Sequence, residues 1–161
     1  MKNLVTIVAL GVMSLALTSV AHAQAMRVPY SKALTVDMAK KCIAAAEAEA
    51  KKNSWNMAIA VVDDGGHLVA FSKMDNTQIA SIRIAIDKAQ TANNFRRPSK
   101  ALEDALAGGR MAILGLAGAT PLDGGLPLVL DGKIMGGVGA SGELGGQDAQ
   151  VAKACVDNMG K

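Results

Sequence analysis

The feature that most constrains this chain is a pair of short apolar runs, at residues 126–130 and 134–140, separated by Asp131-Gly132. An Asp-Gly pair between strand-like runs predicts a β-hairpin, because a type I′ turn needs a positive φ at both central residues. The second run also carries glycines, at positions 136, 137 and 139. Glycine inside a strand indicates a bulge or the close approach of another group.

Two interpretations of these glycines remain open at the level of sequence. Ser141-Gly142 ends the second strand, and Asp148 lies near the start of a final helical pattern. Bare backbone N–H groups beside a helix N-terminus would suit an anionic ligand. Alternatively, the glycines serve only the tight packing of a helix on the sheet.

The N-terminal 23 residues have the pattern of a secretory signal peptide. A basic start at Lys2 is followed by an apolar stretch at 4–20 and by Ala21-His22-Ala23. This pattern predicts cleavage after Ala23 and a periplasmic or secreted protein. The remainder, 24–161, has the length of one domain and contains no further stretch long enough to span a bilayer.

Composition excludes several classes of function. The formal charge is +3, and about +2 without Lys2, while the aromatic residues are only two Phe, one Trp and one Tyr. Nucleic acid is therefore not an expected partner, since basic and aromatic side chains are not interleaved. His67 is the single histidine outside the predicted signal peptide, which excludes a metal site with two imidazoles from one subunit.

The two cysteines, Cys42 and Cys155, each lie on a predicted helix. In an exported chain, they could form a disulfide if those helices pack side by side. Two buried free thiols are the alternative.

The apolar periodicity predicts an α+β fold, in which helices pack on the faces of a central antiparallel sheet of about five strands. Thr35, Asn76 or Thr77, and Ser99 are the expected caps of the first three helices. The predicted helices cover residues 36–52, 78–94, 99–107 and 146–159, and the predicted strands cover 55–62, 67–74, 111–119, 126–130 and 134–140.

The sequence contains few residues that could form a standard catalytic or cofactor-binding site. The G-x-G-x-x-G match at 137–142 starts inside a strand and is not a dinucleotide fingerprint. The remaining polar candidates lie at the ends of elements: Met74, Asp75, Lys88, Ser141, Gln147 and Asp148. If they converge, Asp75 and Lys88 could form an acid–base pair. Otherwise the two aspartates are helix caps and Lys88 is a surface lysine.

Five ordered motifs resemble the GlcG/HbpS-like haem-binding family and the C-terminal domain of PduO-type corrinoid adenosyltransferases. The motifs are VVDDGGHLVAF at 61–71, KMD at 73–75, KAQTA at 88–92, GGLPL…DGKIMGGVGASG at 124–142 and QDAQVA at 147–152. Family members usually have Arg at the position of Lys73.

The resemblance implies a profilin-like domain that assembles into homo-oligomers, often octamers, and that binds haem or a related tetrapyrrole. Its candidate contacts are His67, Met74, Lys88, Gly125, Ser141 and Gln147, with His67 as a candidate iron ligand.

Three functions follow, in order of preference. The first is an exported haem- or tetrapyrrole-binding protein. The second is a small cofactor-free lyase or isomerase that acts on an organic acid through Asp75 and Lys88. The third is a structural or sensory oligomer without a small ligand.

Overall fold

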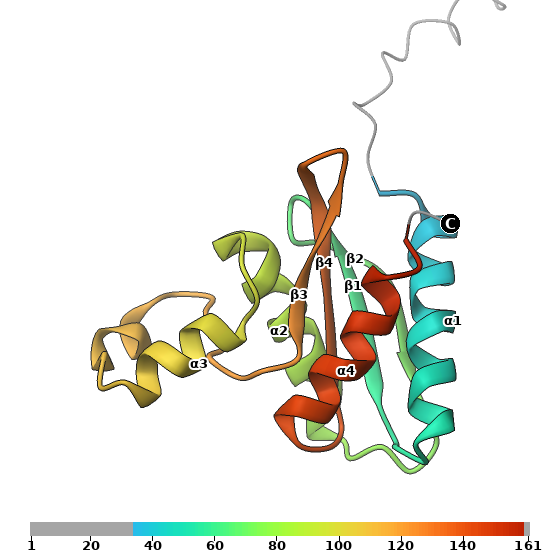
Figure 1. Cartoon of the computed structure of the whole chain (residues 1–161), viewed down its shortest axis with the longest axis horizontal. Coiled ribbons are helices and arrows are strands. Elements are labelled where there is room, and N and C mark those ends of the chain that lie inside the picture. The colour runs from blue at the N-terminus through green and yellow to red at the C-terminus, as the bar shows by residue number, and fades with distance from the viewer. Residues whose placement is uncertain (1–33, 160–161) are drawn as a thin grey trace, which may run out of the picture. The chain divides into compact units, whose positions relative to one another are not determined.

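The structure is a computed structural model that describes residues 34–159, so the predicted signal peptide and its cleavage site lie outside the described residues. The chain in that range alternates helices and hairpin-linked strands (Figure 1). The elements are α1 (Val36–Lys52), β1 (Ala58–Asp63), β2 (Leu68–Lys73), α2 (Ala80–Phe95), α3 (Lys100–Ala107), the 3₁₀ helix η1 (Met111–Gly115), β3 (Gly125–Leu130), β4 (Lys133–Ser141) and α4 (Gly145–Val156).

Within residues 34–159, one antiparallel sheet has the strand order β2-β1-β4-β3. The α+β class and the antiparallel sheet are confirmed, while the expected count of about five strands is wrong by one. The missing strand is the segment 111–119, where η1 forms instead. Most of that segment is exposed and only Ile113 is buried. A short apolar run fits a strand or a helical turn equally well by periodicity, and here the helical turn forms.

Strand β1 is buried on both faces, as its continuous apolar run predicts. Ile59 and Val61 belong to a core shared with α1 and α4, whereas Ala58 and Ala60 pack towards α2 on the opposite face. Figure 1 shows α1 and α4 on one side of the sheet and α2 on the other. The domain therefore has three layers.

The hairpin between β3 and β4 is confirmed. Asp131 has a φ of 50° and Gly132 a φ of 73°, and Leu130 pairs with Lys133 across them. Both central residues thus have the left-handed conformation that the type I′ turn requires.

The glycines of β4 allow the backbone of α2 to lie directly on the strand. A Cβ atom at Gly139 would stand 2.1 Å from the carbonyl oxygen of Ala85, and one at Gly137 would stand 2.3 Å from that of Ala89. Tight helix packing therefore explains these two glycines. The alternative, a bare backbone open to a ligand, is wrong for them because α2 covers the strand.

The same close packing changes which residues of α2 are buried. The periodicity predicts a buried face of Ile79, Ile82, Ile86 and Ala89. Ala89 is buried, but Ile79 is 83% exposed and Ile82 and Ile86 are half-buried. The buried face consists mainly of small and polar residues: Ser81, Ala85, Lys88, Ala89, Thr91, Ala92 and Asn93. Large side chains do not fit where two backbones touch.

A predicted side chain makes a capping hydrogen bond at only one of the three helices. Thr35 accepts a hydrogen bond from the backbone N–H of Met38 and caps α1. The predicted cap of α2 is wrong: Ile79 holds the N-cap position, and Thr77 donates its hydroxyl to the Met74 carbonyl. Ser99 holds the N-cap position of α3 as predicted, but its hydroxyl donates to the Leu122 carbonyl and makes no capping bond. Ser99 also accepts from the Gly125 N–H, so it secures the start of β3.

Cys42 on α1 and Cys155 on α4 form a disulfide between two fully buried positions. The sequence left open whether the two cysteines form a disulfide or stay as buried free thiols, and the structure shows the disulfide. It joins positions 113 residues apart, so it closes a loop that contains the whole sheet.

The double variant Cys42→Ala/Cys155→Ala is expected to lose about 4–5 kcal/mol of unfolding free energy, because a loop of this length loses much entropy when it is closed. Urea unfolding of the oxidised protein and of the variant measures the difference. As a control, dithiothreitol should lower the midpoint of the wild type and leave that of the variant unchanged. Equal midpoints for the oxidised wild type and the variant would contradict the expectation.

Gly139→Ala is expected to lower the free energy of unfolding by about 1–3 kcal/mol, because the added methyl group forces α2 away from β4. Gly146→Ala is the matched control, since a Cβ there meets no atom within 4 Å. That control should be neutral or stabilising by about 0.4–1 kcal/mol. Thermal and urea unfolding of both variants test the contact, and equal effects would show that it is unimportant.

Candidate functional site

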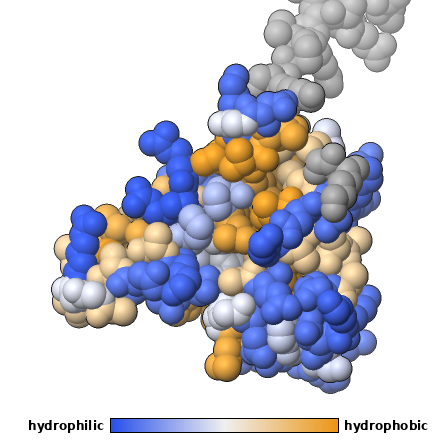
Figure 2. Space-filling model, in the orientation of Figure 1, coloured by the Kyte–Doolittle hydropathy of each residue, from blue (hydrophilic) through white to orange (hydrophobic). Residues whose placement is uncertain are grey.

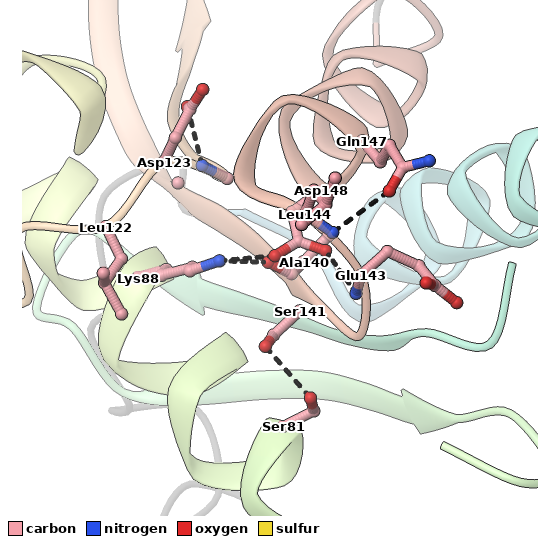
Figure 3. Close-up of polar contacts among 12 residues, drawn as sticks. Ser81, Lys88, Leu122, Asp123, Ala140, Ser141, Glu143, Leu144, Gln147 and Asp148 are labelled. Carbon is pink, nitrogen blue, oxygen red and sulfur yellow. Dashed lines mark hydrogen bonds and ion pairs between the residues drawn. The ribbon is translucent and has the colours of Figure 1, made fainter. Parts of the chain in front are cut away.

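A buried ion pair links α2 to the N-terminal turn of α4 (Figure 3). The ammonium of Lys88 lies 2.7 Å from Oδ2 of Asp148 and donates to the carbonyl oxygen of Ala140 at 3.2 Å. Both charged side chains are only 3% exposed. The sequence-based alternative of a surface lysine is therefore wrong, and Lys88 and Asp148 meet as the pocket hypothesis requires.

The carboxylate of Asp148 also accepts from the backbone N–H of Glu143 at 3.1 Å. Burial raises the pKa of Asp148, and the hydrogen bond from Lys88 opposes that rise. Since a buried charge without a partner is costly, the pair depends on both members.

The residues around the ion pair are themselves buried, so they shield the pair from solvent. The Ser141 hydroxyl donates to the Ser81 hydroxyl at 3.1 Å in a buried position. A Cβ at Gly125 would stand 2.3 Å from the Lys88 carbonyl oxygen. Three of the predicted contacts, Lys88, Gly125 and Ser141, are thus inside the protein, where they hold α2 against the sheet.

Gln147 has a local role beside the pair. Its side-chain oxygen accepts from the backbone N–H of Leu144 at 3.1 Å, at the start of α4. It satisfies one of the N–H groups that a helix N-terminus leaves without a partner.

Met74 and Asp75 lie in a different place, at the end of β2. They line a polar pocket of about 320 Å³. Its other walls are Glu47, Lys51, Asn56, Ser72, Lys73 and Asn76. Lys88 is not among these walls, so the structure does not bring the proposed acid–base pair together in this pocket.

A larger, mainly apolar groove of about 500 Å³ runs between α1 and the edge strand β2. Its walls are Val36, Lys40, Ile43, Ala44, Glu47, Val69, Ala70, Phe71 and Ser72. Glu47 and Ser72, which are hydrogen-bonded to each other, also line the polar pocket, so the two hollows adjoin. We call the two together the α1–β2 groove.

The α1–β2 groove was not predicted from the sequence, because it forms between two elements whose packing the pattern does not specify. One signal was present: β2 is less apolar than β1, and each of its residues is at least partly exposed. A half-exposed strand is typical of a sheet edge.

His67 lies in the turn between β1 and β2. Its backbone N–H donates to the Asp63 carboxylate at 2.8 Å, and its ring nitrogen Nδ1 lies 3.3 Å from the same oxygen. The imidazole is 82% exposed. Its predicted role as an iron ligand stays a prediction.

Residues 34–159 contain no cluster of three or more His, Cys, Asp or Glu side chains that could hold a metal ion. In the same range, no helix is long and apolar enough to cross a bilayer.

The three layers and the hairpin-linked sheet define an α+β domain with a buried ion pair and an open groove beside its edge strand. The chain belongs to the family described as haem degrading protein HbpS-like, whose pattern matches residues 34–157. This confirms the resemblance seen in the sequence.

Named relatives agree with this assignment. Protein GlcG of Escherichia coli K12 is 47% identical over 108 residues, which cover 67% of this chain and 81% of GlcG. A crystal structure of a Streptomyces reticuli HbpS double mutant is 30% identical, with a TM-score of 0.74, over 81% of this chain and 89% of that one. The crystal structure of a PduOC–haem complex has the same fold, with a TM-score of 0.72 at 24% identity, over 79% of this chain and 95% of that one.

Lys88→Met is expected to lower the free energy of unfolding by about 3–5 kcal/mol, because it leaves the buried Asp148 carboxylate without its cation. Without the ammonium, the pKa of Asp148 in the folded state rises further above the unfolded value. The stability defect should therefore shrink as the pH falls from 7 towards 5 and the folded state takes up a proton.

Urea unfolding at several pH values measures this effect, and Lys88→Met/Asp148→Asn is the matched control. The double variant should be more stable than Lys88→Met at pH 7 and should lack its pH dependence. A single variant as stable as the wild type at pH 7 would show that the ion pair contributes nothing.

Proposed function

We propose that this protein is an exported tetrapyrrole-binding protein that holds haem in the α1–β2 groove. The single observation that carries the proposal is this groove, a half-open hollow of about 500 Å³ with an adjoining polar pocket of about 320 Å³. Ligand pockets commonly measure 300–1,000 Å³ and combine apolar walls with a few polar groups. The family description and the PduOC complex both name haem, which supports the choice of ligand.

The walls suit a flat apolar ring with charged edges. Ile43 and Val69 supply apolar surface in the groove, while Lys51 and Lys73 lie in the polar pocket. Ammonium groups are suitable partners for the carboxylates of a tetrapyrrole. Lys73 stands where the family usually has Arg, so it would keep the positive charge.

Met74 is the candidate iron ligand in this site. It is half-buried, lines the polar pocket and carries a thioether, one of the groups that coordinate haem iron in proteins. Bound haem would supply a redox-active iron, and the groove residues would bind and orient it.

His67 and Met74 cannot serve the same iron within one subunit. They flank β2, and seven residues of extended strand span about 23 Å. The exposed imidazole of His67 stands outside the groove walls. We therefore place the ligand at the Met74 end.

The enzyme alternative has less support. A lyase or isomerase that uses Asp75 and Lys88 needs both groups at one substrate, yet Lys88 is buried against Asp148. A binding function needs no such pair.

Export is supported by the disulfide between Cys42 and Cys155, since disulfides persist mainly in oxidising compartments. The signal-peptide pattern of residues 1–23 predicts the same compartment.

Assembly into a homo-oligomer is supported by exposed apolar side chains. Met111 and Leu114 on η1 are each 63% exposed, and Val129 on β3 is 49% exposed. Figure 2 shows apolar surface over the β3–β4 hairpin and paler apolar atoms on the segment that contains α3. Such surfaces commonly mark contacts with other protein chains.

Titration of the purified protein with haemin is expected to give a Soret band that saturates, and Met74→Ala should weaken binding about tenfold or more and shift the band, because the iron loses its thioether ligand. Native mass spectrometry of the loaded protein gives the number of haems and of subunits. Absence of any band with the wild type would refute the haem proposal.

Two controls locate the site. Met111→Ala removes an exposed methionine outside the groove, and it should bind haemin as the wild type does. His67→Ala should do the same. If His67→Ala abolishes the band while Met74→Ala does not, the ligand lies at the β1–β2 turn and the groove assignment is wrong.

A further inference from the structure

Helix α1 takes part in both the α1–β2 groove and the disulfide, through different faces. Five of its residues line the groove: Val36, Lys40, Ile43, Ala44 and Glu47. Most of these positions are three or four residues apart, so they form one stripe along the helix. Another face is buried and carries Cys42, which is bonded to Cys155 on α4. A movement of α1 away from α4 would therefore also displace one wall of the groove.

The buried face of α1 contributes little apolar area of its own. The buried residues of this helix, all of which the structure describes, are Ala39, Cys42, Ile43, Ala46 and Ala50. Each alanine buries only one methyl group, and the stabilisation from burial is roughly proportional to apolar area. The one large side chain among them, Ile43, also lines the groove. Packing alone therefore holds this helix weakly.

Polar contacts add little to this attachment. Within residues 34–159, two side-chain hydrogen bonds join α1 to another helix or strand. Ser72 on β2 donates to Glu47, and Gln150 on α4 donates to Glu49 at 2.6 Å. Such bonds contribute modestly to stability, because water competes for both groups. The covalent bond between Cys42 and Cys155 is therefore the main constraint on the position of α1.

We propose that the redox state of Cys42 and Cys155 controls ligand binding in the α1–β2 groove. This inference rests on the proposed function, since it concerns the regulation of the same site. In the oxidised protein, α1 is fixed beside α4 and the groove keeps both of its walls. In the reduced protein, α1 separates from the domain, the groove loses one wall, and the ligand dissociates.

The co-reactant for reduction is a dithiol. One of its thiolates attacks a cysteine sulfur and forms a mixed disulfide, which the second thiol of the reductant then resolves. The bond between Cys42 and Cys155 breaks and a new sulfur–sulfur bond forms within the dithiol. Two electrons and two protons pass from the dithiol to the two cysteines.

Burial makes the reduction sensitive to the ligand. Both cysteines are fully buried, so the dithiol reaches them only when α1 opens locally. A ligand in the groove contacts α1 and opposes that opening. Because coupling between two sites is reciprocal, a disulfide that strengthens ligand binding must itself be protected by the bound ligand.

Titration with haemin compares the oxidised wild type with Cys42→Ala/Cys155→Ala, at a temperature at which circular dichroism shows both proteins folded. The double variant should bind about tenfold more weakly or worse. Gly139→Ala is the matched control, because it weakens the contact between α2 and β4 but keeps the disulfide, and it should bind as the wild type does. Equal affinity of the wild type and the double variant would refute the inference, and so would an equal loss in Gly139→Ala.

The reciprocal effect is measured on the wild type, so it does not depend on the folding of a variant. The protein is equilibrated in dithiothreitol buffers of graded redox potential, with and without saturating zinc protoporphyrin IX, which thiols do not reduce. Alkylation of free thiols and mass spectrometry give the reduced fraction. A tenfold coupling moves the midpoint by about 30 mV towards more negative potentials. A midpoint that the porphyrin leaves unchanged would contradict the inference.

Hydrogen exchange separates this inference from the proposed function, because it needs no ligand. Reduction of the wild type should accelerate exchange of the α1 amides about tenfold or more relative to those of α2. If the oxidised protein binds no tetrapyrrole, the proposed function fails, whereas faster exchange in α1 still supports redox control of this groove wall. If haemin binds but reduction leaves α1 unchanged, or accelerates α1 and α2 equally, the redox inference fails and the proposed function stands.

Discussion

The contact between the backbone of α2 and the glycines of β4 determines much of the remaining structure. Because Gly137 and Gly139 carry no Cβ, the helix approaches to a distance at which only small side chains fit beneath it. Ala85 and Ala89 fill that space. The larger isoleucines lie beside that contact: Ile82 and Ile86 are half-buried, and Ile79, at the N-cap, is largely exposed. The two glycines of β4 thus help to determine which residues of α2 are buried and which are exposed to solvent.

The buried ion pair follows from the same geometry. With α2 so close to the sheet, the ammonium of Lys88 reaches the Ala140 carbonyl and the Asp148 carboxylate. It lies inside the protein and joins three elements: α2, β4 and α4. A buried pair of this kind is seldom favoured for its energy alone, since desolvation offsets much of the attraction. In this domain it fixes the position of α4 relative to α2 on opposite sides of the sheet.

The success of the sequence-based predictions varied with the range of the interactions involved. The Asp131-Gly132 turn and the Thr35 cap depend on local chemistry and were predicted correctly. Ser99 was expected to cap a helix, yet its hydroxyl bonds to Leu122 and Gly125, which are distant in the chain. The predicted burial of the isoleucines near α2 was incomplete for a similar reason. Periodicity identifies the apolar face of a helix, but it does not identify the element that packs against that face.

The candidate site shows the same division. The sequence placed Lys88 and Asp148 in one set of six candidates but paired Lys88 with Asp75. The structure pairs it with Asp148 in a buried environment, which no pattern of residue types reveals. Met74 and Asp75 lie instead in a pocket that α1 helps to form, through Glu47 and Lys51. That pocket depends on how α1 leans against an edge strand, which is a property of the assembled layers.

The disulfide has a consequence for the integrity of the chain. It joins α1, at the beginning of the described domain, to α4, at its end. The segment 100–120 stands apart from the sheet (Figure 1) and is largely exposed, as protease-sensitive segments commonly are. A single cut there would leave two polypeptides still covalently joined, so the nicked protein would migrate as one species until the sulfur–sulfur bond is reduced.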